Sequence, residues 1–183
     1  MTVTPDLDAR FRAAALAEGL VDVRYDVVDS PIGALLVAAT DRGLCRVSFS
    51  PEREDEQLAR VFGPRVLRTP LDAVRRELDE YFAGSRTEFD LPIDLRVAPC
   101  HEAVLNELAR VPYGRTETYG GLATRVGRPR AARAVGTVMH SNPIPIVLPC
   151  HRVIGANGSL TGYGGGLHVK RALLELEGAT LPV

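Results

Sequence analysis

The residues of this chain that could do chemistry stand at the end of an apolar, proline-rich run, residues 142–149. Cys150 and His151 follow that run directly, and Arg152 comes next. The thiolate is the reactive form of a cysteine, and neighbouring cations lower the pKa of a thiol. In an extended chain, consecutive side chains point to opposite faces. We therefore expect His151 to reach the sulfur through a bound water, with an acid orienting the imidazole, unless Cys150 is only a buried structural thiol.

A second cysteine–histidine pair, Cys100 and His101, opens an amphipathic segment. The two pairs together have the donor types of a zinc site, but adjacent ligands lack the usual gap of about two to four residues between chelating side chains. We therefore expect no metal and no cofactor. The third cysteine, Cys45, lies in an apolar run and is expected to be buried for packing. Three widely spaced cysteines indicate free thiols in a reducing compartment.

Glycines crowd the segment that follows the reactive pair, residues 155–166, around Tyr163. They indicate either a floppy loop or a backbone that comes close to a flat ligand and offers its own N–H groups. A final helix is expected over residues 167–177, with Glu177 near its end. The six glycines are Gly155, Gly158, Gly162, Gly164, Gly165 and Gly166.

Charge is divided unevenly along the chain. The formal net charge is −1, but residues 1–117 carry −6 and residues 118–183 carry +5. No acidic residue lies between Glu117 and Glu175, a stretch that contains seven basic residues. Such a basic half is typical of a polyanion binder, although a solvated basic face has the same composition.

Size and composition favour a globular protein of one large or two small domains. The chain has 183 residues, of which 45% are hydrophobic and 25% charged. No apolar run approaches the ~20 residues of a membrane span. Residues 1–12 lack the basic-then-apolar order of a secretory signal, so we expect a cytoplasmic protein without a membrane partner.

The elements that must position the reactive residues fall into two units. Residues 1–95 predict a small α/β domain with no catalytic motif. Its three β-rich runs are separated by turn residues and predict an antiparallel sheet. Helical spacing and breakers predict the helices around it. The expected strands are 21–28, 33–39, 43–50 and a returning 89–95, and the expected helices are 13–20, 51–61 and 70–82.

Residues 96–183 predict a mainly helical domain, which makes the fold class α/β (α+β). A helix is expected over 101–111, and a short helix capped by Thr118 ends at Gly127. Arg128 and Pro129 open the next helix, which runs from 130 to 140, with proline in its first turn. Two helices joined by a short glycine-containing turn predict a helix-turn-helix. The second helix is rich in alanine and glycine, which suits close packing on other helices or insertion into a DNA groove.

These residues together resemble the O⁶-alkylguanine-DNA alkyltransferases, also called methylated-DNA–protein-cysteine methyltransferases. The resemblance runs in unbroken order from about residue 112 to residue 178, whereas the first half fits only in its α/β order. It rests on Pro112-Tyr113-Gly114, Thr118-Tyr119, Ala131-Ala132-Arg133-Ala134-Val135-Gly136, Asn142-Pro143, Pro145, Pro149-Cys150-His151-Arg152-Val153, Tyr163, Gly165-Gly166-Leu167, Lys170 and Glu177-Gly178.

The resemblance implies single-turnover repair of O⁶-alkylguanine, and of O⁴-alkylthymine as well, with the alkyl group kept irreversibly on a cysteine. Cys150 is the implied nucleophile, and His151 is the base acting through water. Glu177 orients His151, and Asn142 holds the turn that brings the helix-turn-helix onto the reactive segment. No cofactor takes part.

The implied partner is double-stranded DNA, approached from the minor groove by a monomer. Arg133 fills the gap left by the extruded nucleotide, and Tyr119 crowds its phosphate and meets the guanine ring. The carbonyls of Cys150 and Val153 accept the guanine amine, and the N–H of Gly164 faces O⁶. Arg128, Arg130 and Tyr163 complete the expected DNA- and base-binding set.

The chain departs from its relatives at three positions. Leu105 stands where many carry tryptophan, Cys100 where phenylalanine is common, and Gly164 where serine is frequent; the first two are expected to be packing changes, and the third involves a backbone contact. The alternative is an alkyltransferase-like protein, which binds damage without transfer, but such proteins lack the cysteine found here. A helix-turn-helix regulator would leave the Cys-His-Glu set unexplained. A thiol hydrolase would need an oxyanion hole, which we do not find in the sequence.

Overall fold

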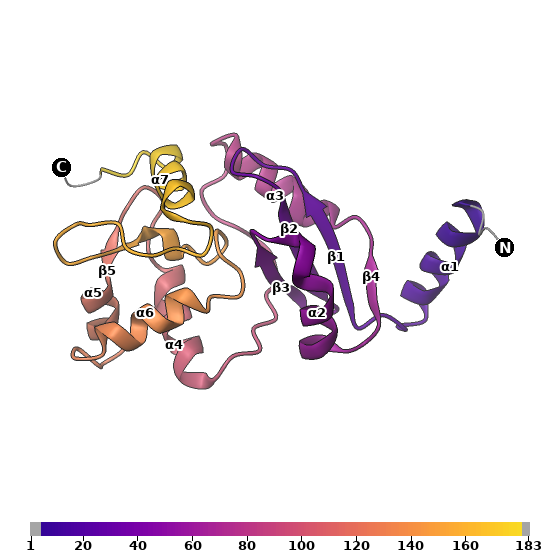
Figure 1. The fold of residues 1–183 in the computed structure, drawn as a ribbon, viewed down its shortest axis with the longest axis horizontal. Helices are drawn as coiled ribbons and strands as arrows, with labels where there is room; N and C mark the ends of the chain where they lie inside the picture. The colour runs from indigo at the N-terminus through magenta and orange to yellow at the C-terminus, as the bar shows by residue number, and fades with distance from the viewer. Residues whose placement is uncertain (1–4, 181–183) are drawn as a thin grey trace.

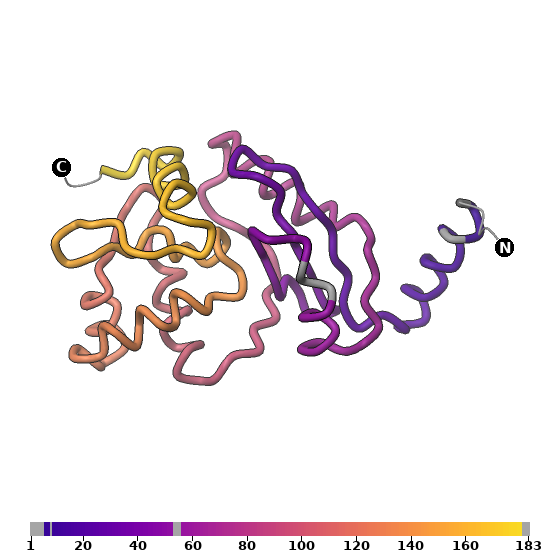
Figure 2. The backbone as a smooth tube through the Cα atoms, in the orientation of Figure 1, coloured from indigo at the N-terminus to yellow at the C-terminus, as the bar shows by residue number. Residues whose placement is uncertain are grey.

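The fold was analysed in a computed structural model that describes residues 5–180, without the side chains of residues 5, 8 and 53–55 (Figure 2). Figure 1 shows a sheet with its helices in one half of the molecule and a group of helices in the other. Helix α1 (Pro5–Ala17) precedes the sheet. None of the helices within residues 5–180 combines the length and apolar character needed to cross a bilayer.

The sheet contains the predicted antiparallel meander and one additional strand. Strands β1 (Val23–Val28), β2 (Leu35–Thr40) and β3 (Gly43–Ser48) pair antiparallel in sequence order. Strand β4 (Val66–Arg68) pairs with β1 in parallel, so the sheet is mixed, in the order β3-β2-β1-β4. A parallel neighbour requires a crossover, which the intervening helix supplies.

Two helical segments cover opposite faces of this sheet. The turn η1 (Pro51–Arg53) and helix α2 (Glu54–Phe62) confirm the helix predicted over 51–61, and α3 (Asp72–Phe82) confirms that over 70–82. Leu58 of α2 packs in a cluster on one face, while Leu78 of α3 belongs to the large cluster on the other. All six residues of β2 are buried because both faces are covered.

The strand expected over residues 89–95 is not formed. This segment touches the sheet only through an isolated bridge between Ile93 and Leu44. Its chain is tied down by the backbone pairs Leu44 N to Pro92 O at 2.8 Å and Asp94 N to Leu44 O at 2.9 Å. Two such bonds hold an extended connection in place, but they do not continue into a ladder.

The second half consists mainly of helices. Helix α4 (Pro99–Ala109) leads to β5 (Glu117–Thr118), α5 (Tyr119–Arg125) and α6 (Ala132–His140). The 3-10 turn η2 (Cys150–Arg152), strand β6 (Val153–Ile154) and helix α7 (Leu167–Leu176) follow. Strands β5 and β6 pair in parallel. The apolar stripe predicted for α4 is confirmed, because Val104, Leu105 and Leu108 are buried.

The predicted helix-turn-helix is α5 and α6, with one difference at its turn. Thr118 Oγ1 accepts from Gly121 N at 2.9 Å, which confirms the cap. Helix α6, however, begins at Ala132, not at residue 130. Ala131 N donates to Arg128 O at 2.8 Å and closes a separate turn around Pro129, so this proline precedes the helix. The expectation of proline in the first helical turn was wrong.

A single cluster of buried apolar side chains runs through both halves. It joins Leu35 and Tyr81 of the first half to Leu105, Leu122 and Cys150 of the second. Leu105 is 1% exposed, which agrees with its interpretation as a packing change, whereas Cys100 is exposed. Cys45 is buried as expected, on the opposite face of the sheet. The reactive segment therefore lies where the two halves share one interior.

Candidate active site

Cys150 lies in a tight turn and not at the end of the expected extended strand. Leu148 N donates to Ile144 O at 2.9 Å, and Arg152 N donates to Pro149 O at 2.9 Å. Ile146 adopts a φ of 76°, in the left-handed region that few residues other than glycine occupy. These turns replace the pleat of a strand, so Cys150, His151 and Arg152 are all buried on a 3-10 turn.

Asn142 fastens this turn to the end of α6. Its Nδ2 donates to Leu148 O at 2.8 Å, and its Oδ1 accepts from Ile144 N at 3.2 Å. Both bonds are buried, and both satisfy main-chain groups that no regular element pairs. The side chain thus links the helix-turn-helix to the loop that carries the cysteine.

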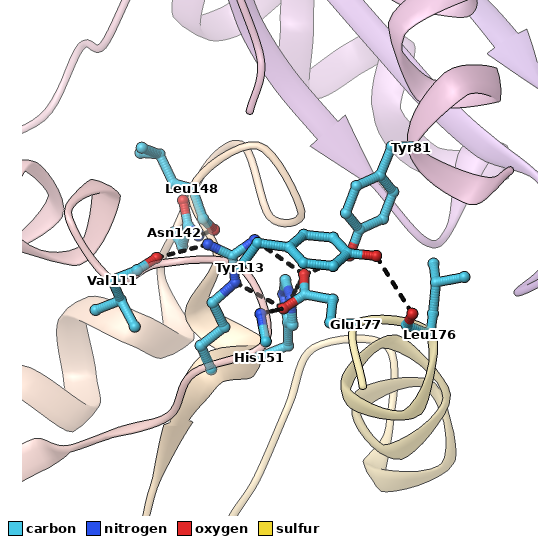
Figure 3. A network of polar contacts seen from close by, with 10 residues as sticks. Tyr81, Val111, Tyr113, Asn142, Leu148, His151, Leu176 and Glu177 are labelled. Carbon is cyan, nitrogen blue, oxygen red and sulfur yellow. Dashed lines mark hydrogen bonds and ion pairs between the residues drawn. The ribbon is translucent and has the colours of Figure 1, made fainter. Parts of the chain in front are cut away.

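Glu177 is the centre of a polar network that includes His151, the residue after the cysteine (Figure 3). It follows α7 directly and is 5% exposed. Its Oε1 accepts from His151 Nε2 at 2.8 Å, Tyr81 Oη at 2.7 Å and Arg152 Nη2 at 2.9 Å. Its Oε2 accepts from Arg152 Nε at 2.8 Å and Gly114 N at 3.2 Å. Five donors therefore converge on one buried carboxylate.

The network fixes the protonation of both partners in the pair His151 and Glu177. Burial raises the pKa of Glu177, but the hydrogen bonds from His151 and Arg152 outweigh it and lower that pKa to about 2. Burial lowers the pKa of His151, and the bond to Glu177 only partly opposes this. The imidazole is therefore neutral at pH 7. With the proton on Nε2 directed at Glu177, the lone pair on Nδ1 is left to accept.

His151 Nδ1 is buried and makes no hydrogen bond within the described residues, and the same holds for Tyr163 Oη. The two rings meet edge to face, with their centroids 6.5 Å apart. Buried polar atoms without partners are uncommon in folded proteins. His151 lies on the turn η2 and Tyr163 lies next to it, so this region offers one acceptor and one hydroxyl to a molecule that enters it.

The thiol of Cys150 is not preformed as a thiolate. Burial raises the pKa of Cys150 to about 11, although Asn142 and Lys170 both oppose the rise. The expectation that the adjacent arginine lowers this pKa was wrong, because Arg152 binds Glu177 and donates to Val111 O at 2.6 Å instead. A protonated thiol needs a base before it can attack.

A hollow of about 450 Å³ lies beside Cys150. Cys150, Tyr163 and Gly164 line it from the second half, and Phe49 lines it from the end of β3. The Phe49 and Tyr163 rings are tilted against each other at 5.5 Å. A Cβ at Gly165 would come within 3.1 Å of Phe49, so one glycine of the rich segment serves this close approach. Sequence reasoning missed Phe49, which is an ordinary apolar residue after a strand.

The carbonyl of Val153 already has a partner in this structure. Lys170 is fully buried, and its Nζ donates to Val153 O at 2.6 Å and to Thr161 O at 3.2 Å. Burial lowers the pKa of Lys170 to about 8, and the nearby Cys150 opposes this change. A carbonyl oxygen has two lone pairs, so Val153 keeps the capacity to accept a second donor.

The expected DNA-facing residues lie apart from the buried network. Arg128, Arg130 and Arg133 are exposed on the helix-turn-helix. Tyr119 is half-buried, its hydroxyl bonds Thr161 Oγ1 at 2.7 Å, and its ring lies 3.9 Å from the position of a Cβ on Gly136. Part of the small surface of α6 therefore serves contact with Tyr119. Within the described residues, no three histidine, cysteine or acidic side chains gather as a metal site would require.

Comparisons with known proteins agree with this geometry. Residues 23–95 match the profile of the ribonuclease-like domain of 6-O-methylguanine DNA methyltransferase, and residues 99–179 match that of its DNA-binding domain. The methylated-DNA–protein-cysteine methyltransferase of Mycobacterium tuberculosis (strain H37Rv) is 43% identical over 165 residues, covering 87% of this chain and 95% of the relative. That of Methanosarcina acetivorans is 41% identical over 157 residues, covering 85% and 98%.

Solved structures give the same result. The crystal structure of the M. tuberculosis O6-methylguanine methyltransferase is similar with a TM-score of 0.77 at 42% identity, covering 88% of this chain and 96% of that one. The OGT of the same organism in complex with DNA gives a TM-score of 0.74 at 42% identity, covering 85% and 92%. The chain therefore belongs to the 6-O-methylguanine DNA methyltransferases, the family also called methylated-DNA–protein-cysteine methyltransferases.

Proposed function

We propose that this protein repairs DNA by direct reversal, moving the alkyl group of O⁶-alkylguanine onto Cys150. The observation that carries the proposal is the buried thiol of Cys150, whose pKa is raised, followed by the neutral His151, whose Nε2 is hydrogen-bonded to Glu177. Membership of the methyltransferase family supports the substrate class. O⁴-alkylthymine carries its alkyl group on a comparable exocyclic oxygen and is proposed as a second substrate.

In the proposed reaction, the thiol proton of Cys150 passes through one water to Nδ1 of His151. The sulfur then attacks the alkyl carbon in line, and a carbon–sulfur bond forms as the bond from carbon to O⁶ breaks. The electron pair of that bond stays on the guanine, which takes up a proton from solvent as it leaves, and His151 later returns the thiol proton to solvent. Glu177 stabilises the imidazolium formed on the way. Asn142 keeps the turn in place.

The product is a thioether, and the proposed reaction therefore happens once per molecule. Neither water nor a second thiol displaces a thioether methyl group at an ordinary site. Nothing in the proposed cycle regenerates the thiol of Cys150. The protein is consumed in equal amount with the lesions that it repairs.

We propose that double-stranded DNA binds along the helix-turn-helix from the minor-groove side. Arg128 and Arg130 are exposed and suit phosphate contacts, which carry affinity but little sequence information. Arg133 is proposed to occupy the space of an extruded nucleotide, and Tyr119 to crowd its phosphate. The exposed backbone at Gly164, together with Tyr163 and the carbonyls of Cys150 and Val153, is proposed to receive the base.

We further propose that residues 1–95 and 96–183 are the two domains of a monomer. The ranges of the two family profiles, 23–95 and 99–179, support a division near residue 96. A cytoplasmic location is proposed because the substrate is DNA and the three cysteines are free.

Intact mass measurement after incubation with an O⁶-methylguanine oligonucleotide tests the proposal. The expected result is a gain of one methyl group per chain, confined to the peptide that contains Cys150. The variant Cys150→Ser should lose transfer but keep DNA binding, because the exposed arginines are unchanged. Multiple turnovers, or methyl groups on Cys45 or Cys100, would contradict the mechanism.

A further inference from the structure

The polar network around Glu177 includes a side chain from the first half of the molecule. Tyr81 lies on α3, is fully buried, and donates its hydroxyl to Glu177 Oε1 at 2.7 Å (Figure 3). The two residues are 96 positions apart in the chain. Among the residues that the structure describes, the other donors to this carboxylate come from the second half, namely His151, Arg152 and Gly114.

Tyr81 and His151 bind the same oxygen atom. Oε1 also accepts from Arg152 Nη2, so three donors share it at 2.7–2.9 Å. An oxygen that accepts several hydrogen bonds offers less negative charge to each of them. Burial raises the pKa of Tyr81, and the charge of Glu177 adds to that rise, so the hydroxyl stays protonated and remains a donor. Tyr81 therefore competes with His151 for the charge that would stabilise an imidazolium.

We propose that Tyr81 is a positioning residue that acts through Glu177 to keep His151 in its neutral, proton-accepting form at neutral pH. The α/β half thereby supplies one component of the reactive network. This inference rests on the proposed function of His151 as the base for Cys150.

The titratable and charged groups that face Glu177 and His151 come from five segments. Removing a neutral hydroxyl changes no formal charge among them, so the effect of the variant can be assigned to the hydrogen bond. Around Glu177 and His151 they are Tyr81 on α3, Tyr113 in the loop before β5, Cys150 and Arg152 on η2, Tyr163 in the glycine-rich segment, and Lys170 on α7.

The test compares the wild type with Tyr81→Phe over pH 5.5–9, using single-turnover transfer from free O⁶-benzylguanine so that DNA binding plays no part. Phenylalanine keeps the ring contacts with Phe82 and Phe89, and Glu177 keeps four donors. Thermal melts of both proteins check that the fold is intact. Tyr25→Phe is the matched control, because Tyr25 packs in the cluster on the opposite face of the sheet.

The expected result is a shift to higher pH of the acid limb of the pH–rate profile. A Glu177 carboxylate with one donor fewer stabilises the imidazolium of His151 more strongly. The loss of one hydrogen bond from a neutral hydroxyl predicts a rate roughly threefold to tenfold below that of the wild type along the acid limb, and equal rates at pH values above both limbs. Tyr25→Phe should follow the wild type throughout. A ratio of rates that does not change with pH, or a shift to lower pH, would overturn the role of Tyr81.

A second readout does not depend on transfer. The ring resonances of His151, followed against pH without DNA, should show a higher pKa in Tyr81→Phe than in the wild type. An unchanged or lower pKa would refute the inference, whereas a wild type that fails to take up an alkyl group would refute the proposed function. The two failures are therefore distinguishable.

Discussion

Replacing Glu177 with glutamine removes the charge on which the buried network depends. The side chain keeps its size, but its amide nitrogen faces either Arg152 Nε and Gly114 N, or Tyr81, His151 and Arg152 Nη2. Whichever way the amide turns, its nitrogen, which can only donate, faces the donors of neighbouring residues. Arg152, whose side chain is 7% exposed, loses its counterion without gaining access to water.

Two arguments give similar magnitudes for Glu177→Gln. Removing one partner of a buried ion pair typically costs about 3–5 kcal/mol. The pKa of Glu177 falls from its ordinary 4.5 to about 2 in the folded protein, which corresponds to about 3 kcal/mol of stability at neutral pH. We therefore expect a loss of about 3 kcal/mol, a large part of the ~5–15 kcal/mol that stabilises such a protein.

Urea unfolding at pH 7 measures this loss. With an m-value of about 2 kcal/mol per molar, the midpoint should fall by roughly 1.5 M. Glu175→Gln is the matched control: it removes the same charge from an exposed position on α7 and should shift the free energy of unfolding by no more than ~0.5 kcal/mol.

The change of this stability loss with pH follows from the direction of the pKa shift of Glu177. A depressed carboxyl pKa contributes stability that is complete above pH 4.5 and is lost as the pH falls toward 2. The gap in unfolding free energy between the wild type and Glu177→Gln should therefore narrow by about half between pH 5 and pH 3. A gap below about 1 kcal/mol at pH 7, or one that does not change with pH, would show that Glu177 does not stabilise the network as argued.

Two further predictions concern DNA and backbone geometry. Arg133→Ala should slow transfer from duplex DNA by roughly tenfold but leave transfer from free O⁶-benzylguanine unchanged, because only the duplex must be held open; equal losses on both substrates in single-turnover assays would count against this role. Gly114→Ala should lower the melting temperature more than Gly127→Ala. Both glycines have φ near +70°, but only at Gly114 would a Cβ meet a backbone oxygen, that of Glu177 at 2.7 Å; equal shifts would show that this contact relaxes.

Local patterns in the sequence predicted the elements whose signals are themselves local. Helical spacing around Leu78 predicted α3, and turn residues between apolar runs predicted the meander of β1, β2 and β3. The family resemblance brought together Cys150, His151, Asn142 and Glu177, and the structure has them adjacent.

Features that depend on distant partners were not predicted. Strand β4 has three residues, too few for an alternating pattern, and pairs with β1 more than 40 positions earlier. Tyr81 resembles any aromatic residue on the buried face of a helix, and only the fold brings its hydroxyl to Glu177. The turn before Cys150 was missed because its apolar, proline-rich composition suits an extended chain as well.

The shared interior of the two halves affects how the molecule unfolds. Leu35 and Tyr81 pack in the same cluster as Leu122 and Cys150, so loosening either half strips packing partners from the other. Residue 96 lies between the two family profiles, but the packing of the two halves is continuous across it. If the proposed transfer places an alkyl group on Cys150, the added volume crowds a cluster that also contains Leu35 of the sheet, so we expect the alkylated protein to lose stability in both halves.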